Sequence, residues 1–119
     1  MLACVAISGI SAEQKPPVKG VLLQSQQQWV DSIMKSMTLD EKIGQLFMVR
    51  AHSDKGADHI RSIKHLITTY KIGGLCFFQG TAEKQIELTN EYQKLASPVP
   101  LMLSMDAEWG PAMRFKTGV

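Results

Sequence analysis

The amino-acid sequence predicts an α/β fold in which the strands of a parallel sheet alternate with helices. Three short apolar segments, at residues 47–49, 75–78 and 101–105, are separated by two stretches with apolar residues at helical spacing. Short apolar runs bounded by turn residues are typical of buried strands. Their alternation with helices favours right-handed βαβ units in one sheet. An open doubly wound sheet fits this pattern, and so do about three units of an eight-stranded (β/α)8 barrel of roughly 250 residues.

The N-terminal region is predicted to hold an export signal followed by a linker. Residues 1–12 are small and apolar, as at the end of a signal peptide, although no Lys or Arg precedes Leu2. This run is too short to span a membrane, which takes about 20 apolar residues. Residues 13–27 contain two prolines and several glutamines without an apolar period, which predicts a linker. We therefore expect an exported protein whose folded domain covers residues 28–119.

Two helices are predicted before the first strand. The apolar residues of the first fall on one helical face and predict an amphipathic helix that ends at about Ser36 or Met37: Trp29, Val30, Ile33, Met34 and Met37. Thr38 and Glu41 have the spacing of a capping box, which predicts the start of a second helix. Gly44 disfavours a long helix, so we expect the chain to enter the first strand at Phe47.

Two further helices connect the strands. Residues 57–70 carry apolar side chains every three or four positions: Ile60, Ile63, Leu66, Ile67 and Tyr70. The pair Gly73-Gly74 is suited to turn the chain from this helix into the second strand. Residues 82–96 repeat the pattern with Leu88, Tyr92 and Leu95 on one side. The prolines of residues 97–100 end this helix before the third strand.

An acidic segment directly follows the third strand, where α/β folds bind ligands. Asp106 and Glu108 are two residues apart, so in an extended chain their side chains point to the same side. Ionised carboxylates accept hydrogen bonds, and adjacent sugar hydroxyls are suitable donors. Trp109 can offer a flat apolar face to a sugar, and Gly110 permits a close backbone approach.

The same residues allow other interpretations. Asp106 can cap the turn after the strand, Glu108 can pair with Arg114, and Trp109 can pack in the core. Asp-x-Glu is also half of a site for a hard cation, but no second acidic cluster accompanies it. We therefore expect no metal ion.

Histidine and cysteine do not form a catalytic motif in this sequence. His52 follows the first strand and can border a site, but catalysis would require a positioned partner. His59 and His65 are expected to be solvated or partly packed on their helix, and Cys76 to be a small buried core residue. Nucleotide-binding, serine-hydrolase and zinc motifs are absent from the sequence, so no cofactor is expected. Lys and Arg are scattered and the net charge is +2, which argues against a nucleic-acid partner.

Three ordered segments, at residues 37–46, 71–75 and 100–110, together with Arg114, resemble glycoside hydrolase family 3. The resemblance extends from about Trp29 to Val119. It implies a TIM-type barrel as the catalytic domain and a carbohydrate substrate. Members of this family hydrolyse terminal β-linked sugars with retention of configuration. The oligomeric state is left open.

The resemblance also implies roles for individual residues. Asp106 matches the aspartate that binds hydroxyls of the terminal sugar, and Glu108 and Arg114 match positions that we expect to support the loop or the pocket rim. The segment is most similar to the bacterial β-N-acetylhexosaminidase branch, with Trp109 in place of a glycine. The export signal expected at residues 1–12 predicts a periplasmic or extracellular location in a bacterium. A β-glucosidase and a non-catalytic carbohydrate-binding remnant are the alternatives. No position matches the family's nucleophile or acid/base, so both are expected beyond Val119 and the 119 residues alone are expected to be inactive.

Overall fold

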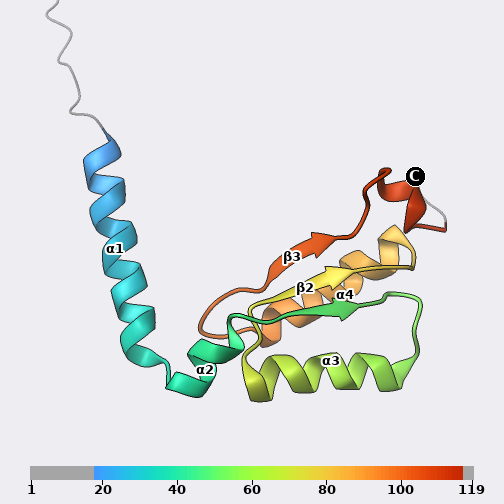
Figure 1. Cartoon of the computed structure of the whole chain (residues 1–119), viewed down its shortest axis with the longest axis horizontal. Coiled ribbons are helices and arrows are strands. Elements are labelled where there is room, and N and C mark those ends of the chain that lie inside the picture. Colours follow the sequence, from blue (N-terminus) through green and yellow to red (C-terminus); the bar gives the residue numbers. More distant parts are fainter. Residues whose placement is uncertain (1–17, 117–119) are drawn as a thin grey trace, which may run out of the picture.

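The computed structural model describes the backbone of residues 18–116 and side chains from Ser25 onward. It shows a three-stranded parallel sheet with the strands and helices in alternation (Figure 1). The elements follow one another as α1 (Val18–Ser36), α2 (Leu39–Gly44), β1 (Met48–Ala51), α3 (Ala57–Tyr70), β2 (Gly74–Phe77), α4 (Ala82–Leu95), β3 (Met102–Met105) and the 3-10 helix η1 (Pro111–Met113). The predicted α/β class and parallel sheet are confirmed.

The first helix is longer than the sequence pattern predicted. It begins at Val18, so residues 18–27, which were expected to form part of a linker, are helical. Glutamine has a high intrinsic helix propensity, which allows a helix without an apolar period. This helix extends away from the sheet (Figure 1). The apolar side chains of Trp29 and Met34 on it are exposed. The expected export signal, residues 1–12, lies outside the described residues.

The short helix α2 has the predicted capping box. The Glu41 amide donates to Thr38 Oγ1 at 3.2 Å, and the Thr38 amide donates to the Glu41 carboxylate at 2.8 Å. This second hydrogen bond is the main cause that lowers the pKa of Glu41. The end of the helix then packs against the start of β2, where Gly44 and Gly73 bring backbone segments together: a Cβ at Gly44 would lie 1.9 Å from the Tyr70 carbonyl oxygen.

The strands lie in the order β1-β2-β3, with Met48, Gly74 and Met102 in register at one end. Alternate residues therefore point to opposite faces. One face, which carries Leu75 and Phe77, is covered by α3 and α4. The buried residues of this core come from β1, β2, α3, α4 and the segments that lead into β2 and β3: Ala51, Ile63, Ile67, Ile72, Leu75, Phe77, Leu88, Tyr92 and Leu101.

The other face of the sheet is open in the described part of the chain. Met48 and Met102 are exposed there, and the hydroxyl of Ser104 lies 3.2 Å from the sulfur of Met48. Cys76 belongs to this face and is only partly buried, so the expectation of a buried core cysteine is wrong. Its neighbours Leu75 and Phe77 point the opposite way, because the direction alternates along a strand.

Candidate functional site

The candidate site lies at the carboxyl edge of the sheet, where the segments that follow the three strands meet. The Phe78 amide donates to the Ala51 carbonyl at 2.9 Å, and the Asp106 amide donates to the Phe77 carbonyl at 3.3 Å. Parallel pairing therefore continues past the ends of the strands. This continuation aligns the first residues after each strand and places them at one edge.

The segment after β3 is held to the segment after β2 by its backbone. The Gly80 amide donates to the Arg114 carbonyl at 3.2 Å, and the Lys116 amide donates to the Gly80 carbonyl at 3.0 Å. A side chain at Gly80 would collide with Ser53, since a Cβ there would lie 1.6 Å from the serine Oγ. Glycine at this position allows all three segments to approach closely.

Asp106 and Arg114 form the central charged pair of the site. The guanidinium Nε of Arg114 donates to the backbone carbonyl of Asp106, and a terminal nitrogen lies 2.5 Å from Asp106 Oδ2. The Arg114 side chain is 12% exposed, whereas that of Asp106 is 38% exposed. The arginine is thus an internal support, and the carboxylate remains accessible to a ligand.

The loop between these two residues turns sharply. The Gly110 amide donates to the Ala107 carbonyl at 3.0 Å, and Gly110 has a φ of 94°, which glycine adopts without the strain that other residues incur. The helix η1 then brings Arg114 back toward the strand end. The loop is therefore closed at its base by the contact between Arg114 and Asp106.

This turn changes the predicted geometry of the acidic segment. A turn at residues 108–109 interrupts the extended chain on which the alignment of Glu108 with Asp106 depended. Glu108 is exposed, and the ion pair of Arg114 is made with Asp106, not with Glu108 as one alternative proposed. Trp109 is 87% exposed and does not pack in the core.

Residues 18–116 contain no group of three or more acidic, histidine or cysteine residues able to hold a metal ion.

Phe78 is a site residue that the sequence analysis did not identify. Its ring lies under the guanidinium of Arg114, with Cζ 4.6 Å from the ring centroid, and 5.6 Å from Cζ of Arg50. The ring also stacks on His52 at 5.7 Å between centroids. The sequence pattern assigned Phe78 to the second strand, whereas it is the first residue after β2. The signal in the sequence that could have identified Phe78 was its position as an aromatic residue at the carboxyl end of a predicted strand.

His52 borders the site as a buried imidazole. Its backbone amide donates to His59 Nε2 at 3.1 Å, and its Nδ1 lies 3.7 Å from Asp54 Oδ1. Burial is the main cause that lowers the pKa of His52, and the cations of Lys55 and Arg50 lower it further, against the opposing effect of Asp54. The Nε2 atom is buried without a hydrogen-bond partner among the described residues. The ring is therefore neutral at neutral pH and acts as a packing partner of Phe78.

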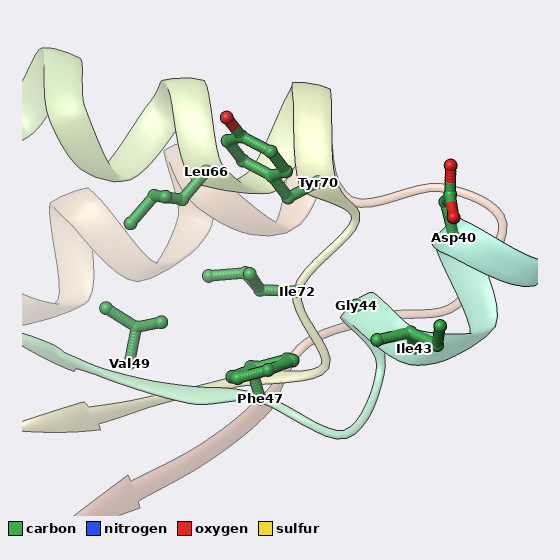
Figure 2. Close-up of a pocket in the computed structure, with 8 residues that line it drawn as sticks. All are labelled: Asp40, Ile43, Gly44, Phe47, Val49, Leu66, Tyr70 and Ile72. Carbon is green, nitrogen blue, oxygen red and sulfur yellow. The ribbon is translucent and has the colours of Figure 1, made fainter.

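An apolar hollow of the described structure lies elsewhere. It measures about 510 Å³ and lies between α2, α3 and the amino end of β1. Figure 2 shows Phe47, Val49, Leu66 and Ile72 around a common apolar space, with Asp40 at its margin. A sugar site needs several convergent polar groups, so this hollow does not fit a carbohydrate. The polar groups converge instead around Asp106.

None of the helices in residues 18–116 is long and apolar enough to cross a membrane.

Residues 38–119 match a family model described as the glycosyl hydrolase family 3 N terminal domain. The matched region begins at the capping box of α2 and includes the whole sheet and the loop that carries Asp106. No curated protein matches the chain.

Proposed function

Because the chain belongs to glycosyl hydrolase family 3, we propose that the protein hydrolyses terminal β-linked sugars, specifically N-acetyl-β-hexosaminides, by a retaining mechanism. Family membership supports glycoside hydrolase activity in general and a carbohydrate substrate. The choice of hexosaminides rests on the sequence of residues 106–110, which is most similar to that branch of the family.

One observation carries the assignment of the sugar-binding residue. Asp106 lies at the carboxyl end of β3, its Oδ2 is engaged by Arg114, and its side chain is partly exposed. No hydrogen bond from residues 18–116 engages Oδ1. A carboxylate that is oriented in this way can accept hydrogen bonds from two adjacent ring hydroxyls without rearrangement. Asp106 therefore binds the terminal sugar, and Arg114 holds the Asp106 carboxylate in position.

Glu108 has a lesser role in this proposal. It is exposed on the turn of the loop, beyond the contact that fixes Asp106. No ion pair holds its carboxylate among the described residues, so its orientation is not fixed as that of Asp106 is. We therefore assign it to the rim of the pocket.

The architecture that we propose for the whole domain is a TIM-type barrel, of which these units form the N-terminal part. The open sheet face and the exposed side chains of Met102 and Leu103 on β3 support it, since further strands and helices would cover them. In the absence of such cover, exposed apolar surface and strand edges favour association. The isolated 119 residues should therefore self-associate in analytical ultracentrifugation, and a monomeric, cooperatively melting chain would argue against the barrel.

The bond-breaking groups are assigned to positions outside this sequence. Retaining glycosidases usually use two carboxyl groups about 5 to 5.5 Å apart, one as nucleophile and one as acid/base. None of the 119 residues matches either family position. The residues of this sequence bind and orient the sugar, and the export signal would direct the enzyme to the periplasm or the exterior of a bacterium.

The test is an assay of the protein expressed from its complete reading frame. Release of nitrophenol from nitrophenyl β-N-acetylglucosaminide should exceed release from the β-glucoside. The reverse preference would indicate the β-glucosidase alternative, and turnover of neither substrate would indicate a carbohydrate-binding remnant. Asp106→Asn should lower kcat/KM by at least about 100-fold, because a charge-assisted hydrogen bond to substrate is lost and the charge of the largely buried Arg114 is left uncompensated.

A further inference from the structure

We propose that Phe78 is a positioning residue that fixes the orientation of the Arg114 guanidinium and, through it, the carboxylate of Asp106. This inference rests on the proposed function of Asp106 as the sugar-binding residue. Phe78 itself touches neither the acidic segment's carboxylates nor a substrate in this proposal. It acts only through Arg114.

The ring of Phe78 is a rigid support because its backbone belongs to the sheet. Its amide donates to the Ala51 carbonyl at 2.9 Å, and the preceding residue, Phe77, is fully buried in the core. Arg114, by contrast, follows a loop of seven residues after Asp106 and has a long side chain with several rotatable bonds. The Phe78 ring, whose backbone is hydrogen-bonded to the sheet, therefore restrains the Arg114 side chain, which follows a loop.

The contact between the two has the geometry of a cation–π interaction. The guanidinium carbon of Arg114 lies 4.6 Å from the ring centroid, within the distance of about 6 Å at which the attraction is significant. The Arg114 side chain is largely withdrawn from water. Water competes less for a desolvated guanidinium, so the attraction is stronger here than on an exposed surface.

The remaining neighbours hold the ring in place from other directions. His52 stacks on it at an interplanar angle of 30°, and the Arg50 guanidinium carbon lies 5.6 Å from its centroid. Because the His52 ring is neutral, it adds no third positive charge to the two guanidinium groups around Phe78. The ring is thus confined between β1 and the loop, and Arg114 has a defined surface on which to lie.

The consequence for the site follows from the two contacts that Arg114 makes with Asp106. Its Nε binds the backbone carbonyl and its terminal nitrogen binds Oδ2, so the guanidinium restrains the backbone and the side chain of Asp106 together. Without the aromatic face, the guanidinium can rotate and release one of these contacts. The carboxylate then loses the orientation that would meet two hydroxyls of a sugar at once.

The experiment is a double-mutant cycle in the protein expressed from its complete reading frame. Phe78→Leu keeps an apolar side chain and removes the ring, Phe78→Tyr keeps the ring, and Arg114→Lys removes the bidentate partner. Phe78→Leu should lower kcat/KM by about tenfold, mainly through KM. In the Arg114→Lys background the same substitution should change kcat/KM by less than about twofold. Phe78→Tyr should retain most of the activity.

The control is Phe47→Leu, which removes an exposed ring at the opposite end of the sheet and should leave kcat/KM unchanged. If Phe78→Leu lowers kcat/KM equally with and without Arg114, the ring has only a structural role and the inference is overturned. The same holds if Phe78→Leu has no effect while Asp106→Asn abolishes activity. Full activity of Asp106→Asn would instead overturn the proposed function of Asp106, and the positioning role of Phe78 with it.

Discussion

Arg114 binds Asp106 at two places, with its Nε–H at the backbone carbonyl and a terminal nitrogen 2.5 Å from Oδ2. The eight-residue separation between the two is bridged by a turn at residues 107–110 and by η1. One side chain therefore closes the loop and orients the carboxylate. The stability of the loop and, in the proposed function, the affinity for the sugar therefore depend on the same contact.

Arg114→Lys should weaken substrate binding and also destabilise the loop. A lysine ammonium cannot make two parallel hydrogen bonds in a fixed plane, so one of the contacts with Asp106 is lost. Loss of a hydrogen bond to a charged group corresponds to roughly 1.5 to 3 kcal/mol, and KM should therefore rise about 10- to 100-fold. Steady-state kinetics of the complete enzyme measure this change.

The matched control for Arg114→Lys is Glu87→Gln, which removes a charge from an exposed ion pair with Lys84 on α4. Exposed pairs of this type contribute little, so its kinetics should equal those of the unmodified protein. A KM for Arg114→Lys within twofold of the unmodified value would contradict the role assigned to the arginine.

The stability of the protein should fall as the pH drops below about 6.5. Burial, followed by the charge of Lys55, lowers the pKa of both His52 and His59 below the ordinary value of 6.5. The unfolded chain then binds more protons than the folded one at acidic pH, so protonation favours unfolding. The loss begins near pH 6.5 and continues until the pH passes the lowered pKa values of the folded state.

Thermal unfolding between pH 7.5 and pH 5.5 measures this effect. His52→Gln and His59→Gln should each reduce the decrease in Tm across this range. His65→Gln is the matched control, because it removes an exposed imidazole from the same helix as His59. An unchanged pH dependence in both His52→Gln and His59→Gln would show that other groups cause it.

Tyr92→Phe should preserve or slightly increase stability. Tyr92 is fully buried, its hydroxyl has no hydrogen-bond partner among the described residues, and burial raises the pKa of that hydroxyl to about 12. Removal of an unpaired buried polar atom avoids a desolvation penalty of about 1 kcal/mol or more. Tyr92→Ala should instead lose roughly 3 to 5 kcal/mol through the cavity that it leaves.

Chemical denaturation of the two Tyr92 variants gives these differences directly. Tyr70→Phe is the control, since it removes a hydroxyl from an exposed tyrosine. A loss of more than about 1 kcal/mol in Tyr92→Phe would mean that the hydroxyl has a partner in solution.

Gly44→Ala and Gly73→Ala should both be destabilising. An added Cβ would lie 1.9 Å from the Tyr70 carbonyl oxygen in the first case and 2.0 Å from the Gln45 carbonyl oxygen in the second. Both obstacles are backbone atoms, which cannot rotate away, so α2 must shift from the end of α3 in the first case and from the segment before β2 in the second. We expect a loss of about 1 to 3 kcal/mol for each, measured as the free energy of unfolding.

Gly56→Ala provides the control for these glycine variants, because no atom lies within 4 Å of a Cβ at that position. Its effect should be limited to the small preference for glycine over alanine at the start of a helix. Equal stabilities of the Gly44, Gly73 and Gly56 variants would show that the contact between α2 and β2 is not tight.

Much of the fold could be predicted from the sequence because its signals are local. The helix from Ala57 to Tyr70 and the capping box of Thr38 and Glu41 depend on residues within a few positions of one another, and both are confirmed. The strand that ends at Met105 is marked by its apolar run. Its position alone indicated that Asp106 would lie at the ligand-binding edge of a parallel sheet.

Local signals also account for the predictions that were wrong. The glutamines before Trp29 have no apolar period, yet their propensity allows α1 to begin at Val18. Trp29 and its apolar neighbours do mark a helix, but the pattern does not specify where it starts. Apolar periodicity identifies the residues that share one face of a helix. A polar helical segment has no apolar residues at helical spacing, so this pattern cannot identify it.

The sequence by itself determined the order of strands and helices, the parallel sheet and the location of Asp106 at the end of a strand. Only the tertiary structure decided that Arg114 pairs with Asp106 instead of Glu108, and that Phe78 supports the arginine. These contacts join segments that follow different strands, and they depend on the path of a loop turned at Gly110. The physical reason is that the choice among several oppositely charged or aromatic partners is made by the three-dimensional distance between them, which spacing along the chain does not specify.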